Sequence, residues 1–181
     1  MTRVARDWRV ELVETYPDLF HPVAGDPPAA QGRPEVGDGW RELLERACAR
    51  IRAVVQADGG TFHVTQIKEK YGTLRLYRQS ALSREADARV EEAIDLAEAR
   101  SACTCEVCGE PGRLHGSGWL VTRCAVCAAG RPLVASRPGF ENIFVVERII
   151  GKRREVTCRR YDREIDSFVD VDPRSLGIEE E

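Results

Sequence analysis

Five cysteines lie close together in this chain, within the segment CTCEVCGEPGRLHGSGWLVTRCAVC of residues 103–127. Cys105 and Cys108 have the spacing Cys-x2-Cys, and Cys124 and Cys127 repeat it after fifteen intervening residues. A Cys-x2-Cys turn directs two thiolates toward one point, and tetrahedral zinc takes four such soft ligands. The spacing therefore predicts one zinc ion bound by these four cysteines.

The predicted zinc has a structural role. Four thiolate ligands leave no open coordination position for a water molecule, which a catalytic zinc requires. A unit of about 25 residues also buries too little apolar surface to fold alone, so a metal or disulfides must stabilise it. Two disulfides are the alternative, but clustered cysteines in a protein expected to be cytoplasmic indicate a metal site.

The remaining thiols and the histidine of this segment have simpler interpretations. Cys103 lies outside the Cys-x2-Cys spacing, so we predict that it is not a ligand. Cys48 lies on the apolar face of a predicted helix and Cys158 in a predicted strand, where both are expected as small buried residues. His115 is expected in a loop, because four thiolates already complete the metal site.

The segments around the cysteines predict an α+β fold. Apolar residues at helical spacing predict helices near residues 4–16, 40–56 and 82–101, with Pro17 ending the first of them. Residues 61–77 are rich in β-forming types and predict a hairpin. We therefore expect helices packed on a small antiparallel sheet, with a zinc-ribbon or treble-clef-like insertion.

This pattern divides the chain into three parts. Residues 1–101 form the α+β body, and residues 102–131 form the zinc-binding segment, in which residues 119–121 return as a strand and cover the metal. Residues 132–181 carry a second β-hairpin and an acidic tail, packed on the body, whose end is expected to fray.

Composition limits the classes of protein that fit. The chain has 181 residues, of which 43% are apolar and 31% charged, as in an ordinary globular domain. No apolar run approaches the roughly 20 residues of a membrane span. Charges interrupt the first residues, so they do not resemble a secretory signal, and we expect a cytoplasmic protein with no membrane partner. The net charge of −3 weakly disfavours a protein built mainly to hold nucleic acid.

Charge is unevenly distributed, however. Residues 101–160 have a net charge of +5, and residues 161–181 a net charge of −6. The candidate contacts for a nucleic acid or another partner are Lys152, Arg153, Arg154, Arg159 and Arg160. Two alternatives remain open: Arg113, Arg123 and Arg131 would neutralise a zinc site with four thiolates, and the remaining cations would pair with the acidic tail. The carboxylates of residues 162–172 lack calcium-loop spacing and are expected to form a solvated face.

Four motifs give the chain a resemblance to known proteins. GDGW (37–40), IKEKYGTLR (67–75), CEVCGEPGRL (105–114) and GWLVTRC (118–124) resemble a group of small bacterial and prophage proteins. The resemblance implies a shared fold over residues 37–127 but brings no established activity. A weaker resemblance is to the zinc finger of DksA/TraR proteins, in which a helix also leads into CxxCG. The β-hairpin at 61–77 departs from the long helical hairpin of those proteins and argues against their polymerase-binding role.

The sequence contains no recognisable catalytic arrangement. It has three histidines, none of them after Cys127, whereas an HNH-type nuclease needs histidines after its zinc knuckle. Lys68, Glu69 and Lys70 are expected to be alternating charges on the solvent face of a hairpin. We therefore expect a non-enzymatic zinc-containing binding protein with a protein partner, such as a toxin, a host enzyme or a phage component. The alternative is a nucleic-acid-binding protein, or a nucleic-acid-acting enzyme, that uses the basic segment 148–160.

Overall fold

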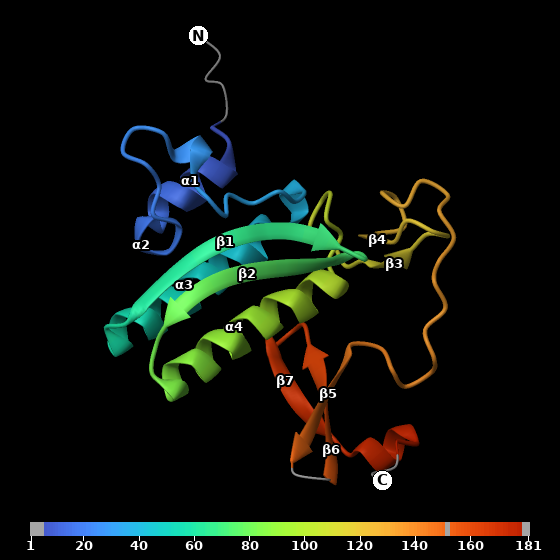
Figure 1. Cartoon of the computed structure of the whole chain (residues 1–181). Helices are drawn as coiled ribbons and strands as arrows, with labels where there is room; N and C mark the ends of the chain where they lie inside the picture. Colours follow the sequence, from blue (N-terminus) through green and yellow to red (C-terminus); the bar gives the residue numbers. More distant parts are fainter. Residues whose placement is uncertain (1–5, 151–152, 179–181) are drawn as a thin grey trace.

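The computed structural model describes residues 6–150 and 153–178 (Figure 1). Its helices and small antiparallel sheets confirm the predicted α+β class. The strands of the described residues form three separate sheets, with the orders β1-β2, β3-β4 and β5-β6-β7. Within the same residues, no helix is both long and apolar enough to cross a membrane.

The main core lies between two long helices and the first hairpin. α3 (Arg41–Asp58) and α4 (Arg84–Ala102) lie side by side and cover one face of β1 (Thr61–Lys70) and β2 (Thr73–Ala81) (Figure 1). Apolar residues recur every three or four positions in α3, which places them on the face that packs against this core. The buried residues of α3 are Leu43, Leu44, Ala47, Cys48, Ile51, Val54 and Val55.

The hairpin reverses at a two-residue turn. Tyr71 and Gly72 have φ angles of 54° and 81°, and two positive φ angles give the type I′ turn whose twist matches the flanking strands. The cross-strand pair Lys70–Thr73 closes this turn, and pairing continues to Thr61–Ala81. The hairpin therefore extends beyond the predicted end at residue 77.

The N-terminal segment forms two short helices where one was predicted. α1 (Trp8–Thr15) begins after Asp7, and α2 (Pro17–Phe20) follows after a single residue. Pro17 follows the end of α1, as expected, and also begins α2, because the first helical position needs no N–H donor. Residues 4 and 5 of the predicted helix lie outside the described residues.

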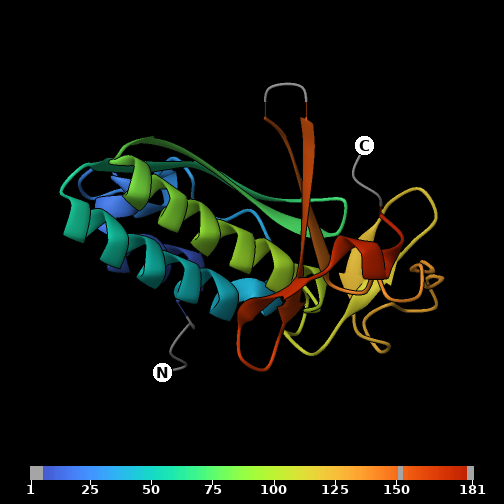
Figure 2. The same cartoon turned by 90° about the horizontal axis from the view of Figure 1, so that it is seen from below.

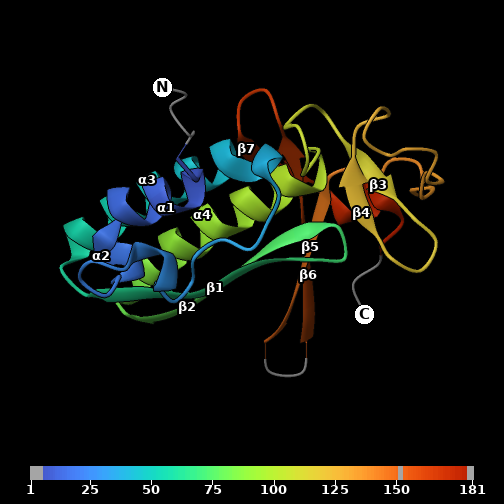
Figure 3. The same ribbon diagram turned by 90° about the horizontal axis from the view of Figure 1, so that it is seen from above.

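A three-stranded sheet follows the cysteine segment. It consists of β5 (Ile143–Ile150), β6 (Arg153–Asp162) and β7 (Ser167–Val171), and a 3-10 turn (Pro173–Leu176) comes after it. The β5–β6 hairpin projects well beyond the helices (Figures 2 and 3). The third strand, β7, was not predicted from the sequence; all of its residues pair with β6.

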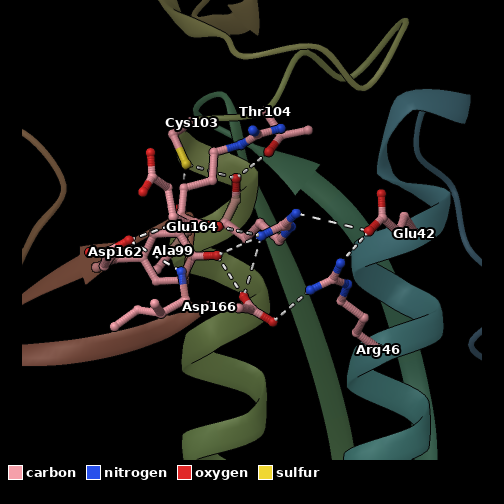
Figure 4. Close-up of polar contacts among 12 residues, drawn as sticks. Glu42, Arg46, Ala99, Cys103, Thr104, Asp162, Glu164 and Asp166 are labelled. Atoms are coloured by element: carbon pink, nitrogen blue, oxygen red, sulfur yellow. Dashed lines mark hydrogen bonds and ion pairs between the residues drawn. The ribbon is translucent and has the colours of Figure 1, made fainter.

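One carboxylate joins this sheet to the helices. Asp166 lies in the turn between β6 and β7, and only 7% of it is exposed. Its Oδ2 accepts hydrogen bonds from Arg50 (2.7 Å) and Arg46 (3.3 Å) of α3, and its Oδ1 accepts one from the hydroxyl of Tyr161 (2.6 Å). Figure 4 shows Arg46 reaching from α3 to this carboxylate.

α4 contributes a third guanidinium to the same cluster. Arg100 Nη1 lies 3.6 Å from Asp166 Oδ1 and donates hydrogen bonds to the Tyr161 hydroxyl (3.1 Å) and the Arg163 carbonyl (3.2 Å). Burial raises the pKa of Asp166, but the hydrogen bonds from Tyr161 and Arg50 outweigh it and hold that pKa below its usual value. The prediction of a solvated acidic face is therefore wrong for Asp166, which is buried and fully engaged.

Candidate metal centre

The four cysteines predicted as ligands come together in space. One Sγ atom from each of Cys105, Cys108, Cys124 and Cys127 lies within 4.8 Å of all the others. Cys108 Sγ is 3.7 Å from the Sγ atoms of both Cys124 and Cys127. Four sulfurs at 2.3 Å from a tetrahedral zinc would be roughly 3.8 Å apart, whereas a disulfide needs about 2.05 Å. The cluster therefore has the size of a metal site and not of a disulfide pair.

The first Cys-x2-Cys turn is held by its own backbone. The N–H of Gly109 donates to the carbonyl of Cys105 (2.9 Å), and the N–H of Cys105 donates to the carbonyl of Glu110 (2.8 Å). Gly109 has a φ of 81°, a left-handed conformation that glycine adopts without strain. This local turn places both sulfurs on one side of the chain.

The second turn is built in the same way. The N–H of Ala128 donates to the carbonyl of Cys124 (2.9 Å), and the N–H of Cys127 donates to Cys124 Sγ (3.4 Å). Between the two turns, β3 (Arg113–His115) and β4 (Val121–Arg123) form a short antiparallel pair. We call residues 103–131 the cysteine ribbon.

The environment of Cys105 favours its thiolate form. Burial raises the pKa of this thiol, but N–H groups of Cys124, Cys108 and Val107 outweigh burial and lower it to about 7. A thiolate is the form that binds a metal ion. At least one ligand is therefore prepared for binding near neutral pH.

The GDGW motif packs directly against the first cysteine turn. The N–H of Gly39 donates to the carbonyl of Glu106 (2.8 Å), and the N–H of Gly37 donates to Glu106 Oε1 (3.0 Å). Trp40 is fully buried, and its indole Nε1 donates to the carbonyl of Thr104 (2.9 Å). The motif therefore fixes the position of the ribbon on the body.

The turn of the first hairpin contacts the other side of the ribbon. Thr122 of β4 donates from its hydroxyl to the carbonyl of Gly72 (2.7 Å), and a Cβ at Gly72 would lie 2.5 Å from Leu114 Cδ1. The GDGW, KYGT and cysteine motifs are thus neighbours in space. The sequence predicted the ribbon as an insertion, without these contacts. A glycine next to an aromatic residue in both motifs, Gly39 before Trp40 and Gly72 after Tyr71, was the available signal of close packing.

Other predicted residues have different positions from those expected. His115 is a buried residue of β3, not of a loop, and its Nδ1 lies 3.0 Å from the carbonyl oxygen of Arg131. Trp119 lies outside β4 and is largely exposed, so it does not cover the sulfur cluster, contrary to the prediction.

The cysteines outside the cluster lie as predicted. Cys103 is not part of the sulfur cluster, and its Sγ donates to the carbonyl of Arg100 (3.3 Å). Cys158 is buried in β6, as predicted.

The basic segment is partly neutralised within the protein. Arg159 forms salt bridges with Glu92 (2.6 Å) and Asp95 (3.4 Å) of α4, and with no carboxylate of the described part of the acidic tail. Arg160 is exposed and donates to the carbonyl of Gly139 (3.0 Å). Arg153 and Arg154 belong to β6, and Lys152 lies outside the described residues.

Of the arginines predicted near the metal, one has a defined partner. Arg123 forms a salt bridge with Glu106 (2.9 Å), which lies between Cys105 and Cys108. Arg113 and Arg131 are exposed. The ribbon therefore holds one arginine next to its ligands and leaves two at its surface.

A groove of about 760 Å³ lies beside the ribbon, between the end of α4 and residues 133–144. Its ionisable side chains are those of Cys103, Arg113 and Glu141. Burial raises the pKa of Cys103, which keeps it a thiol and a weak nucleophile. The groove therefore has no activated nucleophile.

The end of the ribbon that carries the sulfur cluster exposes two aliphatic side chains. Val107 directly precedes Cys108 and is 52% exposed, and Val126 directly precedes Cys127 and is 88% exposed. Equivalent positions of the two turns thus present apolar groups to solvent next to the sulfur cluster.

Comparisons of the chain with protein-family models, with curated proteins and with solved structures find no match.

Proposed function

We propose that the cysteine ribbon binds one structural zinc ion through Cys105, Cys108, Cys124 and Cys127. Four sulfurs at the spacing of a tetrahedron support zinc over harder metals, which prefer oxygen ligands. With four thiolates the ion has no free position, so it stabilises the ribbon and does not take part in a reaction. A reducing compartment such as the cytoplasm would keep all four thiols available.

We further propose that the protein is a non-enzymatic binding protein whose partner is another protein. The observation that carries this proposal is the exposure of Val107 and Val126 at equivalent positions of the two cysteine turns. Apolar side chains held on a rigid, metal-stabilised end are suited to a protein interface. The groove beside the ribbon does not support an enzyme, because its thiol is protonated and its charged groups are few.

The nucleic-acid alternative that uses the basic segment 148–160 has less support. Salt bridges to Glu92 and Asp95 occupy Arg159, so its charge is not free to contact phosphates. Arg160 remains exposed but uses one of its donors for Gly139. Protein binding by the ribbon therefore remains the better interpretation.

Site-specific photo-crosslinking in the native host tests the protein-binding proposal. A benzoylphenylalanine at Val126 should form a crosslink to a discrete partner protein, whereas the same group at Val23, which is 68% exposed and follows α2 away from the ribbon, should not. The crosslink at residue 126 should disappear in a Cys108→Ser background, because the ribbon end loses its shape. Equal crosslinking from both positions, or none from residue 126, would contradict the proposal.

A further inference from the structure

The first hairpin has a solvent face whose charges are all of one sign. Side chains alternate along β1, so Lys68 and Lys70 lie on one side of the strand and Glu69 on the other. Glu69 is occupied at the turn, where its carboxylate accepts a hydrogen bond from the N–H of Gly72. The alternating charges expected from the sequence are therefore separated by the strand, and the two lysines share the face that turns away from α3 and α4.

Two exposed tyrosines accompany these lysines. Lys68 Nζ lies 5.3 Å from the ring centroid of Tyr77, and Lys70 Nζ lies 5.3 Å from that of Tyr71. Tyr71 is 67% exposed and Tyr77 is 42% exposed. We call these four residues the outer hairpin face.

The two lysines have no carboxylate partner within the described residues. Every salt bridge found there has an arginine as its cation. Arg75, which lies opposite Lys68 across the hairpin, is bound to Glu98 of α4. Glu35 pairs with Lys68 through backbone alone. Glu98 therefore neutralises Arg75, and Lys68 and Lys70 are left as the charges of this face without a counter-charge in the described part of the chain.

We propose that the outer hairpin face binds single-stranded nucleic acid. Unpaired lysines on one strand match the repeated negative charge of a phosphate backbone. The exposed tyrosine rings provide flat surfaces on which unpaired bases stack, a contact that a duplex or an acidic peptide cannot make. This site is separate from the cysteine ribbon and from the basic segment 148–160.

The surroundings leave room for an extended strand. The helices cover the opposite side of the hairpin, and the β5–β6 hairpin projects past the outer face at one side of it (Figures 2 and 3). A nucleic acid lying along β1 and β2 would therefore contact the hairpin on one side and remain exposed to solvent on the other. The short basic surface and the net charge of −3 predict weak binding, with a salt slope of only about −0.7 for each contacting lysine.

Fluorescence anisotropy with a labelled oligothymidylate of about 16 nucleotides tests this proposal, at salt concentrations from about 50 to 200 mM. The full-length protein should bind, and Lys68→Gln with Lys70→Gln should weaken binding about tenfold and reduce the salt slope by about 0.7 for each lysine. Tyr71→Asn with Tyr77→Thr should weaken binding with little change in slope, because it removes stacking and not charge. Asn tolerates the positive φ at position 71, so the turn is preserved.

A charge-matched variant provides the control. Arg84→Gln with Arg89→Gln removes two exposed cations of α4 outside the outer hairpin face and should change affinity less than twofold. The proposal is overturned if the unmodified protein does not bind the oligonucleotide at the lowest salt concentration. It is also overturned if the control and lysine variants lose affinity equally, or if a duplex or polyglutamate competes as well as the single strand. Zinc content and melting temperature are measured for every variant, so loss of fold is distinguished from loss of binding.

Discussion

The Cα of Gly39 lies so close to the first cysteine turn that a Cβ there would be 2.2 Å from the carbonyl oxygen of Cys105. The same Cβ would lie 2.4 Å from the backbone nitrogen of Gly109. Backbone atoms cannot move aside as a flexible side chain can, so this contact requires glycine. The loop before α3 and the cysteine ribbon therefore form one packed unit.

Gly39→Ala should destabilise the protein by about 2–3 kcal/mol, because a methyl group overpacks a site bounded by backbone. Urea unfolding of zinc-loaded protein measures this loss. The control is Gly59→Asn, at a position with a φ of 77° and nothing within 4 Å of a Cβ, where less than about 1 kcal/mol should be lost. A fully stable Gly39→Ala protein would show that the ribbon and the loop do not pack as described.

Asp166→Asn should destabilise the folded protein by about 2–3 kcal/mol, because it leaves the buried guanidinium of Arg100 without its counter-charge. Asparagine keeps the left-handed backbone of this turn, so the change isolates the charge. Asp170→Asn, an exposed carboxylate in β7, should change stability by less than about 0.5 kcal/mol. Equal effects of the two substitutions would mean that Asp166 does not hold the C-terminal sheet on the helices.

The same carboxylate predicts a pH dependence. Its pKa is lower in the folded protein than the usual value of 3.8, so its contribution is complete above that value and is lost as the pH falls through the lowered pKa. The stability difference between the unmodified protein and Asp166→Asn should therefore be constant from pH 7 to pH 5 and shrink below about pH 4. Paired urea titrations across this range measure the difference, and acid-induced metal loss affects both proteins alike. If the stability difference between the two proteins grew on acidification, the pKa of Asp166 would be raised by folding and not lowered.

Cys103→Ser should keep its zinc and melt near the temperature of the unmodified protein. Its thiol lies outside the sulfur cluster and donates to a helix carbonyl, which a serine hydroxyl can also do. Cys108→Ser should lose zinc and destabilise the ribbon, because three thiolates remain where four are needed. Metal analysis and tryptophan fluorescence follow both changes, since the indole of Trp40 is bonded to Thr104 beside the site. The reverse behaviour would place Cys103 among the ligands.

Local patterns predicted much of this protein. Helical periodicity in α3 and α4 predicted their extents to within a few residues, because each buries a continuous apolar stripe. The repeated Cys-x2-Cys spacing identified four residues that the fold brings together, because each turn is set by its own backbone hydrogen bonds.

Contacts between distant segments were beyond these patterns. Asp166 lies in an acidic stretch and looked like a solvated residue, but its partners Arg46 and Arg50 are more than a hundred residues away in sequence. The packing of Gly39 on Cys105 is also a long-range contact with no periodic signal. Side chains alternate between the two faces of a strand, and this rule applies to charged residues as well as to apolar ones. Applied to the charges of β1, it predicts that Lys68 and Lys70 share one face.

Zinc-edge X-ray absorption spectroscopy, combined with elemental analysis of protein purified without added metal, tests the central claim most directly. We predict one zinc per chain with four sulfur neighbours at about 2.3 Å and no nitrogen or oxygen ligand. A zinc content near zero, a shell that includes oxygen, or sulfurs joined in disulfides would contradict a structural zinc bound by Cys105, Cys108, Cys124 and Cys127.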